Sequence, residues 1–177
     1  MIDLETYGVK PGCVILSIGA VAFDRATGEA GARFYKSINL NQSILAGFHQ
    51  EEKTVDWWKR QSVDAYLLSH NGKESPSVVL RSFSKWISEI FTDQPPYVWG
   101  NSARFDMGIL SAAYDICKLE YPIDPFYERD YRTLTSLMPD VRWSIPFEGL
   151  KHDPINDCLH AIKVCSHIIN RIRQVAA

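Results

Sequence analysis

The longest run of hydrophobic residues lies near the beginning of the chain. Residues 14–23 (VILSIGAVAF) are almost continuously apolar and rich in β-branched side chains, which predicts a strand buried on both faces of a sheet. Residues 24–28 have the composition of a turn, and residues 33–39 alternate as the returning strand of a hairpin does. The residues before Thr6 are expected to form a short first strand beside them.

The later part of the chain has the periodicity of helices. Ser75-Pro76 predicts a helix cap followed by proline at the first helical position, and apolar residues follow at helical spacing: Val79, Phe83, Trp86, Ile87 and Ile90. Further expected elements are a strand at 97–100, a helix at 105–117, a strand at 131–134 and a helix from Asp153-Pro154 to about residue 174. This order predicts one α/β domain over residues 1–177, a mixed β-sheet flanked by α-helices.

The composition disfavours some classes of function but does not identify one. Hydrophobic residues make up 46% of the 177 positions, and 19 basic against 21 acidic residues give a formal charge of −2. This charge disfavours a protein that grips long duplex DNA, although an enzyme acting on one strand end can obtain positive charge from bound metal ions. No apolar run approaches the roughly 20 residues that span a bilayer. Only two residues precede Asp3, too few for a signal peptide, so we expect a cytoplasmic protein without a membrane partner.

Two pairs of residues and one single aspartate are the candidates for catalysis or metal binding. Asp3 and Glu5 are two apart on a predicted strand, so they share a face and repel one another unless a cation lies between them. Asp106 follows a predicted strand at the first turn of a helix, and His152 and Asp157 bracket the start of the last helix. Taken singly, each is explained better as surface charge, a helix-start carboxylate or a surface histidine.

Taken as a set, these residues form three ordered motifs. DLET (residues 3–6), NSARFD (101–106) and HDPIND (152–157) resemble the three motifs of the DEDD superfamily of 3′→5′ exonucleases, in its branch with histidine in the third motif. The sequence is most similar to small phage and bacterial exoribonucleases of the mycobacterial and T4-like exonuclease A type, through TVDWWKRQS (54–62) and VWGN (98–101). Members of the superfamily usually carry several residues before the first aspartate, whereas here there are two.

The resemblance implies a ribonuclease-H-like fold and phosphodiester hydrolysis with two divalent cations, Mg²⁺ or Mn²⁺. Asp3, Glu5, Asp106 and Asp157 are the implied metal ligands, with Asp106 acting partly through water. Hard oxygen ligands suit both ions. His152 is the implied general base, because an imidazole with a pKa of about 6.5 accepts a proton near neutral pH.

The expected substrate is the 3′ end of single-stranded nucleic acid, with RNA favoured and nucleoside 5′-monophosphates released. Contacts are expected from Thr6, Trp58, Asn101 and Phe105. The rings of Trp58 and Phe105, with that of Trp57 as a further candidate, are expected to stack on bases without sequence preference. Related enzymes are often homodimers, so a homodimer is expected here as well.

Two alternatives remain open at this point. The same site could act on DNA ends, and the difference depends on contacts to the 2′-hydroxyl that no motif reveals. A non-catalytic nucleic-acid-binding module of the same fold is disfavoured, because such a module is expected to lose acidic ligands and all four are present.

Overall fold

Three antiparallel strands form the larger sheet of the computed structural model, which describes residues 1–176. They are β1 (Ile2–Thr6), β2 (Ile15–Phe23) and β3 (Ala30–Ser37), in the spatial order β1-β2-β3. The expected hairpin and the short first strand are therefore confirmed. The first seven residues of β2 are buried, as its continuous apolar run predicts.

The segment between β3 and β4 contains four helices. The short helices α1 (Leu40–Leu45), α2 (Glu52–Trp58) and α3 (Val63–His70) precede α4 (Pro76–Ile90), the only one of the four predicted from periodicity. Pro76 lies in the first turn of α4 as expected, but Ser75 makes no side-chain capping hydrogen bond. Ile90, expected on the apolar face, is 40% exposed because the helix ends there.

A second, smaller sheet lies beside β1. In it β4 (Val98–Gly100) pairs in parallel with β5 (Glu128–Asp130), and α5 (Ala103–Ile116) and the 3₁₀ turn η1 (Pro125–Tyr127) connect them. Antiparallel and parallel pairing thus both occur, as a mixed α/β fold predicts, but in two separate sheets.

The strand predicted at residues 131–134 is wrong. These residues begin α6 (Tyr131–Leu137), which is followed by α7 (Pro139–Ser144). Asp130 ends β5 and caps α6, because its Oδ1 accepts a hydrogen bond from the Thr133 N–H at 2.7 Å. The aromatic and β-branched residues that suggested a strand therefore lie in the first turn of α6, directly after the strand β5.

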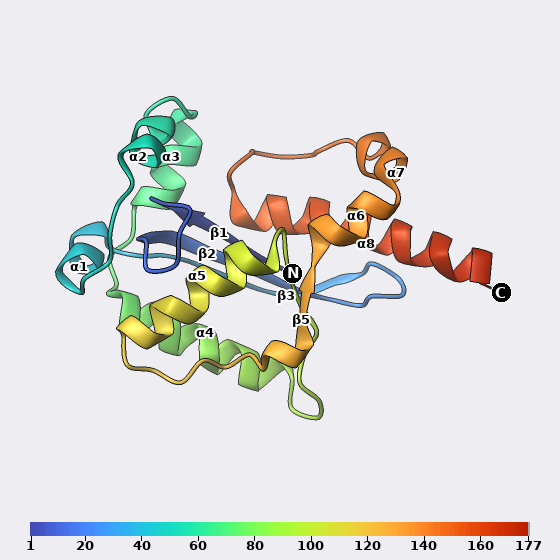
Figure 1. Cartoon of the computed structure of the whole chain (residues 1–177), viewed down its shortest axis with the longest axis horizontal. Coiled ribbons are helices and arrows are strands. Elements are labelled where there is room, and N and C mark those ends of the chain that lie inside the picture. The colour runs from blue at the N-terminus through green and yellow to red at the C-terminus, as the bar shows by residue number, and fades with distance from the viewer. Residues whose placement is uncertain (177) are drawn as a thin grey trace.

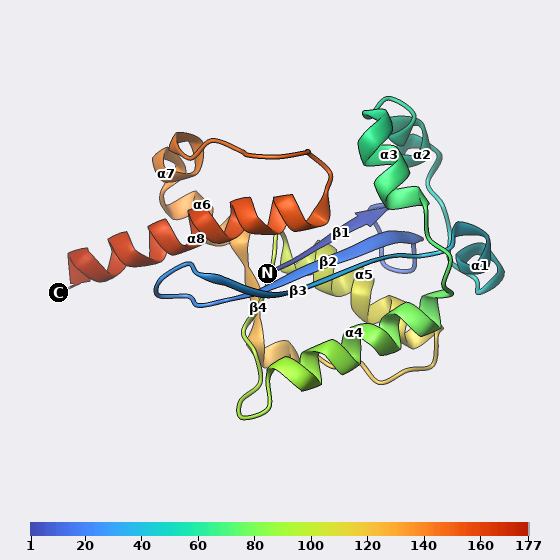
Figure 2. The ribbon, with the colours of Figure 1, turned by 180° about the vertical axis from the view of Figure 1, so that it is seen from behind.

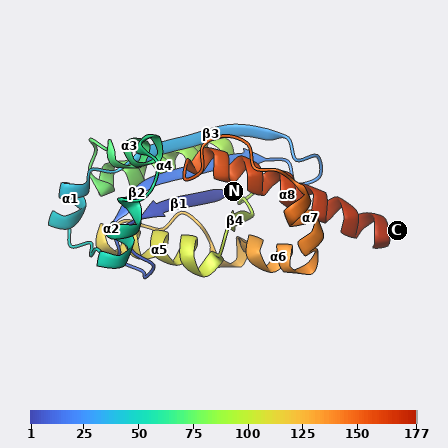
Figure 3. The same cartoon turned by 90° about the horizontal axis from the view of Figure 1, so that it is seen from above.

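Helices cover both faces of the three-stranded sheet. The long C-terminal helix α8 (Pro154–Ala176) crosses one face, while α4 and α5 lie on the other, as the three views show (Figure 1, Figure 2 and Figure 3). Ile2 and Leu4 enter the hydrophobic core on the α4 and α5 side. Since side chains alternate along a strand, Asp3 and Glu5 point to the α8 side. No helix among residues 1–176 combines the length and apolar character needed to cross a membrane.

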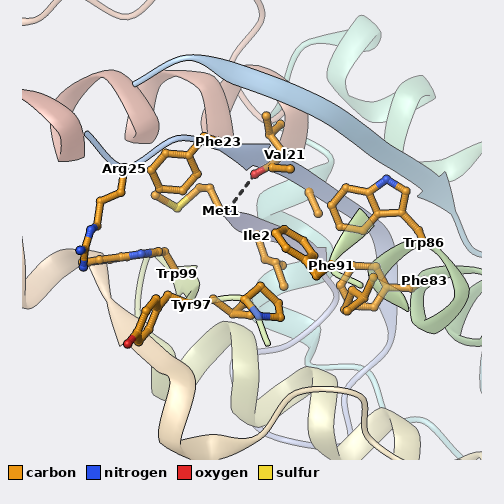
Figure 4. A pocket seen from close by; sticks show the side chains of 15 residues that line it. Met1, Ile2, Val21, Phe23, Arg25, Phe83, Trp86, Phe91, Tyr97 and Trp99 are labelled. Carbon is orange, nitrogen blue, oxygen red and sulfur yellow. Dashed lines mark hydrogen bonds between the residues drawn. The ribbon is translucent and has the colours of Figure 1, made fainter. Parts of the chain in front are cut away.

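A largely apolar cavity of about 200 Å³ lies where β1 and β4 approach one another. Figure 4 shows its aromatic lining, and the Met1 amino group donates a hydrogen bond to the Val21 carbonyl oxygen at its edge. The aromatic residues around it are Phe23, Phe83, Trp86, Phe91, Tyr97 and Trp99. No carboxylate lines this cavity, so it is separate from the acidic residues singled out in the sequence.

Candidate active site

Three carboxylates from opposite ends of the chain meet between β1 and α8. One carboxylate oxygen from each of Asp3, Glu5 and Asp157 lies within 4.8 Å of the other two. β1 supplies the first two from one face, and the first turn of α8 supplies the third. The structure therefore brings together the first and third motifs.

A glycine allows α8 to approach the sheet closely enough for this meeting. Gly19 of β2 pairs with Asp3 of β1, and a Cβ atom at Gly19 would lie 2.9 Å from the carbonyl carbon of Pro154, the first residue of α8. Asp153 holds the start of this helix, since its Oδ1 accepts a hydrogen bond from the Ile155 N–H at 2.9 Å.

Asp106 is buried near enough to the three carboxylates for its charge to act on Asp3 and Glu5. It is 1% exposed in the first turn of α5, and its Oδ2 accepts a hydrogen bond from the Ser102 N–H at 3.1 Å. Burial raises its pKa to about 7 although backbone N–H groups oppose the shift, and its charge in turn raises the pKa of Asp3 and Glu5. It is not part of the group of three, so contact with a metal ion through water stays a prediction.

The electrostatics of the cluster favour a cation. Burial, followed by the charges of Asp157 and Asp106, raises the pKa of Glu5 to about 8, and burial raises that of Asp157 to about 6. Burial and the Glu5 charge raise the pKa of Asp3 well above its ordinary value. Oδ2 of Asp157 is buried and has no hydrogen-bond partner among the described residues. Crowded carboxylate oxygens, one of them unpartnered, fit the ligand preference of Mg²⁺ and Mn²⁺.

His152 lies next to the carboxylates in a strained backbone conformation. Its φ is +62°, in the left-handed region that non-glycine residues rarely adopt, and such strain is concentrated at functional sites. Its Nδ1 is 3.7 Å from Oε1 of Glu5, and its ring packs edge-on against Trp57 at 4.8 Å between centroids. Partial burial, with Lys151, lowers the pKa of His152, so the imidazole is neutral at pH 7.

The four expected substrate contacts fall into two groups. Trp58 is 1% exposed and donates a hydrogen bond from Nε1 to the Thr6 carbonyl oxygen at 2.9 Å, and the Thr6 hydroxyl donates to the Gly8 carbonyl oxygen. Both side chains are thus used inside the protein, and Trp58 offers no accessible ring for stacking. Asn101 is exposed and Phe105 is half-buried, so both have side-chain surface free for substrate.

A second cavity, of about 140 Å³, adjoins the carboxylates. Asp3, Asp157 and Asn101 line it together with residues that sequence reasoning did not select, among them Tyr131, Arg142 and His160. Arg142 lies in the short helix α7, whose few residues show no periodicity. Only its charge between apolar neighbours could have indicated a functional role.

Comparisons with known proteins agree with this geometry. The fold is similar to those of cell-death related nuclease 4 (CRN-4), with a TM-score of 0.64 and 16% identity over 96% of this chain and 63% of that one. It is also similar to S. pombe Pop2p in its Mg²⁺- and Mn²⁺-bound form, with a TM-score of 0.64 and 14% identity over 96% and 82% of the two chains. A third similar fold is that of a 3′-exonuclease that recognises the histone mRNA stem-loop, with a TM-score of 0.59 and 15% identity over 98% of this chain and 80% of that one. The chain thus spans less than two thirds of the length of CRN-4. No curated protein gives a significant sequence match.

The fold is ribonuclease-H-like, as it is in these nucleases. The model of the Rv2179c-like 3′-5′ exoribonuclease domain matches residues 1–169, and the chain belongs to this family. The resemblance inferred from the three motifs is confirmed at this level.

The close approach at Gly19 gives a testable prediction. Gly19→Ala places a methyl group against Pro154, so α8 must shift and carry Asp157 away from β1. We expect hydrolysis to fall by about 100-fold, the effect of a misplacement near 1 Å. Rates with an RNA oligonucleotide measure this. Gly31→Ala in β3 is the control, because its new Cβ would lie 3.6 Å from the nearest atom. Equal rates for both variants would contradict the role of the close approach.

The raised pKa values give a second prediction. These carboxyl groups are protonated more readily in the folded state than in the unfolded chain, so their contribution to the stability of metal-free protein is largest in acid. This contribution should be lost as pH rises from about 4, the ordinary pKa of a carboxyl group, through about 6 to 8, the pKa values of Asp157, Asp106 and Glu5. Divalent cations should reverse this loss, by about 2.7 kcal/mol at 100 times the dissociation constant. That corresponds to a Tm increase of about 5–11 °C for a chain of this length.

Thermal unfolding at several pH values, with chelator and with Mg²⁺, tests this. The Tm with chelator should fall between pH 5 and pH 8, and the increase caused by Mg²⁺ should grow over the same range. A Tm with chelator that does not change with pH would contradict the cluster's electrostatics.

Proposed function

We propose that the protein removes nucleotides from the 3′ end of single-stranded nucleic acid, with RNA favoured, and releases nucleoside 5′-monophosphates. Two divalent cations, Mg²⁺ or Mn²⁺, are its proposed cofactors. The observation that carries the proposal is the convergence of Asp3, Glu5 and Asp157, with an unpartnered buried oxygen on Asp157. Membership of a 3′-5′ exoribonuclease family supports the reaction class and the preference for RNA.

The proposed ligands are the three converging carboxylates, with Asp106 contributing through water. When bound, the ions activate a water molecule for attack on phosphorus and stabilise the charge on the leaving 3′-oxygen. The Mg²⁺- and Mn²⁺-bound form of Pop2p, a protein similar in fold, supports the choice of ions.

His152 is the proposed general base. It is neutral at pH 7 and lies beside Glu5 at the edge of the cluster, so it can take the proton of the attacking water. Edge-on packing against Trp57 limits rotation of the imidazole. Its position outside α8 lets it approach the substrate while Asp157 is fixed by the helix.

Aromatic stacking is the proposed grip on the terminal nucleotide. Trp57 is half-buried beside His152 and takes over the role expected of Trp58, and Phe105 and Asn101 offer a ring edge and an amide. Stacking is tolerant of sequence, as an enzyme that trims strands of any sequence requires. Trp58 instead supports the end of β1 through the Thr6 carbonyl group.

A time course with 5′-labelled single-stranded RNA and DNA of matched sequence tests the function. We expect a ladder that shortens from the 3′ end with Mg²⁺ or Mn²⁺, is faster for RNA, and disappears with chelator. Faster shortening of DNA would overturn the substrate preference, and no shortening of either polymer would overturn the nuclease. The homodimer and the cytoplasmic location stay predictions.

A further inference from the structure

The cavity beside the carboxylates and the proposed base lie toward opposite ends of β1. Met1, Ile2 and Asp3 line the cavity at the beginning of the strand, whereas Glu5, near its end, is the carboxylate next to His152. Residues two apart on a strand are separated by roughly 6.6 Å. Neither Glu5 nor His152 lines the cavity.

This arrangement orients the substrate strand. In an in-line displacement, the attacking and leaving oxygens lie on opposite sides of phosphorus. If water attacks from the His152 side, as proposed above, the leaving 3′-oxygen points toward the cavity. The nucleotide that carries this oxygen, on the 5′ side of the scissile bond, therefore lies over the cavity.

Arg142 supplies the positive charge there. Its side chain is half-buried and lines the cavity with Asp3, Asp157 and Asn101. The neighbouring ion pairs are Arg171–Asp140 and Lys163–Glu148, and within residues 1–176 no carboxylate pairs with Arg142. An arginine without a partner can hold a phosphate group with two parallel hydrogen bonds.

An exposed tryptophan adjoins this arginine. Trp143 is 79% exposed, and the guanidinium carbon of Arg142 lies 5.3 Å from the centroid of its ring. A basic group next to an exposed ring is the combination by which proteins bind single strands, through the backbone and the base together.

We propose that Arg142 and Trp143 form a subsite for the nucleotide on the 5′ side of the scissile bond. Arg142 binds the phosphate group at the 5′ side of that nucleotide, and Trp143 stacks on its base. The direction of the strand in this subsite rests on the proposed function, because it follows from the position of His152.

Binding measurements without hydrolysis test the subsite. Fluorescence anisotropy of a labelled single-stranded RNA oligonucleotide, with Ca²⁺ in place of Mg²⁺, gives the dissociation constant over a range of salt concentrations. Arg142→Gln should weaken binding about 10- to 100-fold, as loss of a charged hydrogen-bonded contact does. The slope of log affinity against log salt should become less steep by roughly 0.7, the value for one phosphate on a single strand.

Three further variants separate this role from a structural one. Arg142→Lys should keep the salt slope but lose part of the affinity, because the charge remains and the paired hydrogen bonds do not. Trp143→Ala should weaken binding about 5-fold or more, and Trp143→Phe should restore most of it. Arg81→Gln, the same charge change at an exposed position of α4 on the other face of the sheet, should change nothing.

A neutral methylphosphonate linkage, moved stepwise along the oligonucleotide, locates the contact. Wild-type protein should lose most affinity, outside the scissile linkage, when the neutral linkage is the one preceding it. Arg142→Gln should be insensitive to that substitution. Unchanged affinity and salt slope in Arg142→Gln, or continued sensitivity to that linkage, would overturn the subsite even if hydrolysis is normal. If wild-type protein hydrolyses nothing but Arg142→Gln still shows both losses, the proposed function fails and a strand-binding subsite stands.

Discussion

Replacing Asp157 by asparagine is expected to remove metal-dependent cleavage while leaving the fold intact. Asp157 is the one carboxylate that α8 contributes to the cluster, and its buried Oδ2 has no other partner among the described residues. Asparagine keeps the shape but lacks the charge that holds a divalent cation. The same change relieves repulsion in metal-free protein, so the Tm with chelator at pH 8 should rise by about 2–4 °C, near 1 kcal/mol at this length.

Rates with labelled RNA and thermal unfolding with and without Mg²⁺ measure both effects. Asp115→Asn is the matched control, since it removes an exposed carboxylate of α5 outside the site. It should retain wild-type activity and the full stabilisation by Mg²⁺. Near-normal cleavage by Asp157→Asn would contradict the two-metal proposal.

Replacing His152 by alanine is expected to reduce turnover by roughly 10²- to 10⁴-fold, the usual contribution of a general base. The carboxylates are untouched, so stabilisation by Mg²⁺ should persist. Loss of the base should also remove the acid limb of the pH–rate profile, which in wild-type protein falls below the usual range of histidine because burial lowers the pKa of His152.

His167→Ala is the matched control, because His167 is exposed on α8 and its Nδ1 lies 2.8 Å from the Lys163 carbonyl oxygen of its own helix. Its kinetics should equal those of wild type. If His152→Ala instead abolishes stabilisation by Mg²⁺, His152 is a metal ligand and another group accepts the proton.

Local pattern was sufficient for the elements whose burial follows a regular pattern along the chain. The apolar run at 14–23 gave β2, and the apolar spacing after Pro76 gave α4, because each signal extends over most of the element. It failed at residues 131–134, where side-chain preference suggested a strand. These residues form a helix because Asp130 caps it and because Tyr131 is buried in a hydrophobic cluster with Cys158 and Ile162 of α8.

The chemistry of the site was also readable from the sequence, since carboxylates at fixed places relative to strand and helix starts form motifs. The sequence by itself determined the exonuclease family, and it predicted the acidic residues and the histidine as the site. Only the tertiary structure decided which of them meet, because the approach of α8 to β1 at Gly19 joins residues more than 150 positions apart.

The two adjacent tryptophans and Arg142 show why the remaining residues around the site could not be predicted from the sequence. Exposure depends on the direction of the short helix α2, which turns Trp58 into the core and leaves Trp57 beside His152. Arg142 lines the cavity beside the carboxylates only because α7 folds back toward α8, a contact between elements with no local signal. Sequence thus specified the residue types, and long-range packing determined which surfaces are left for substrate.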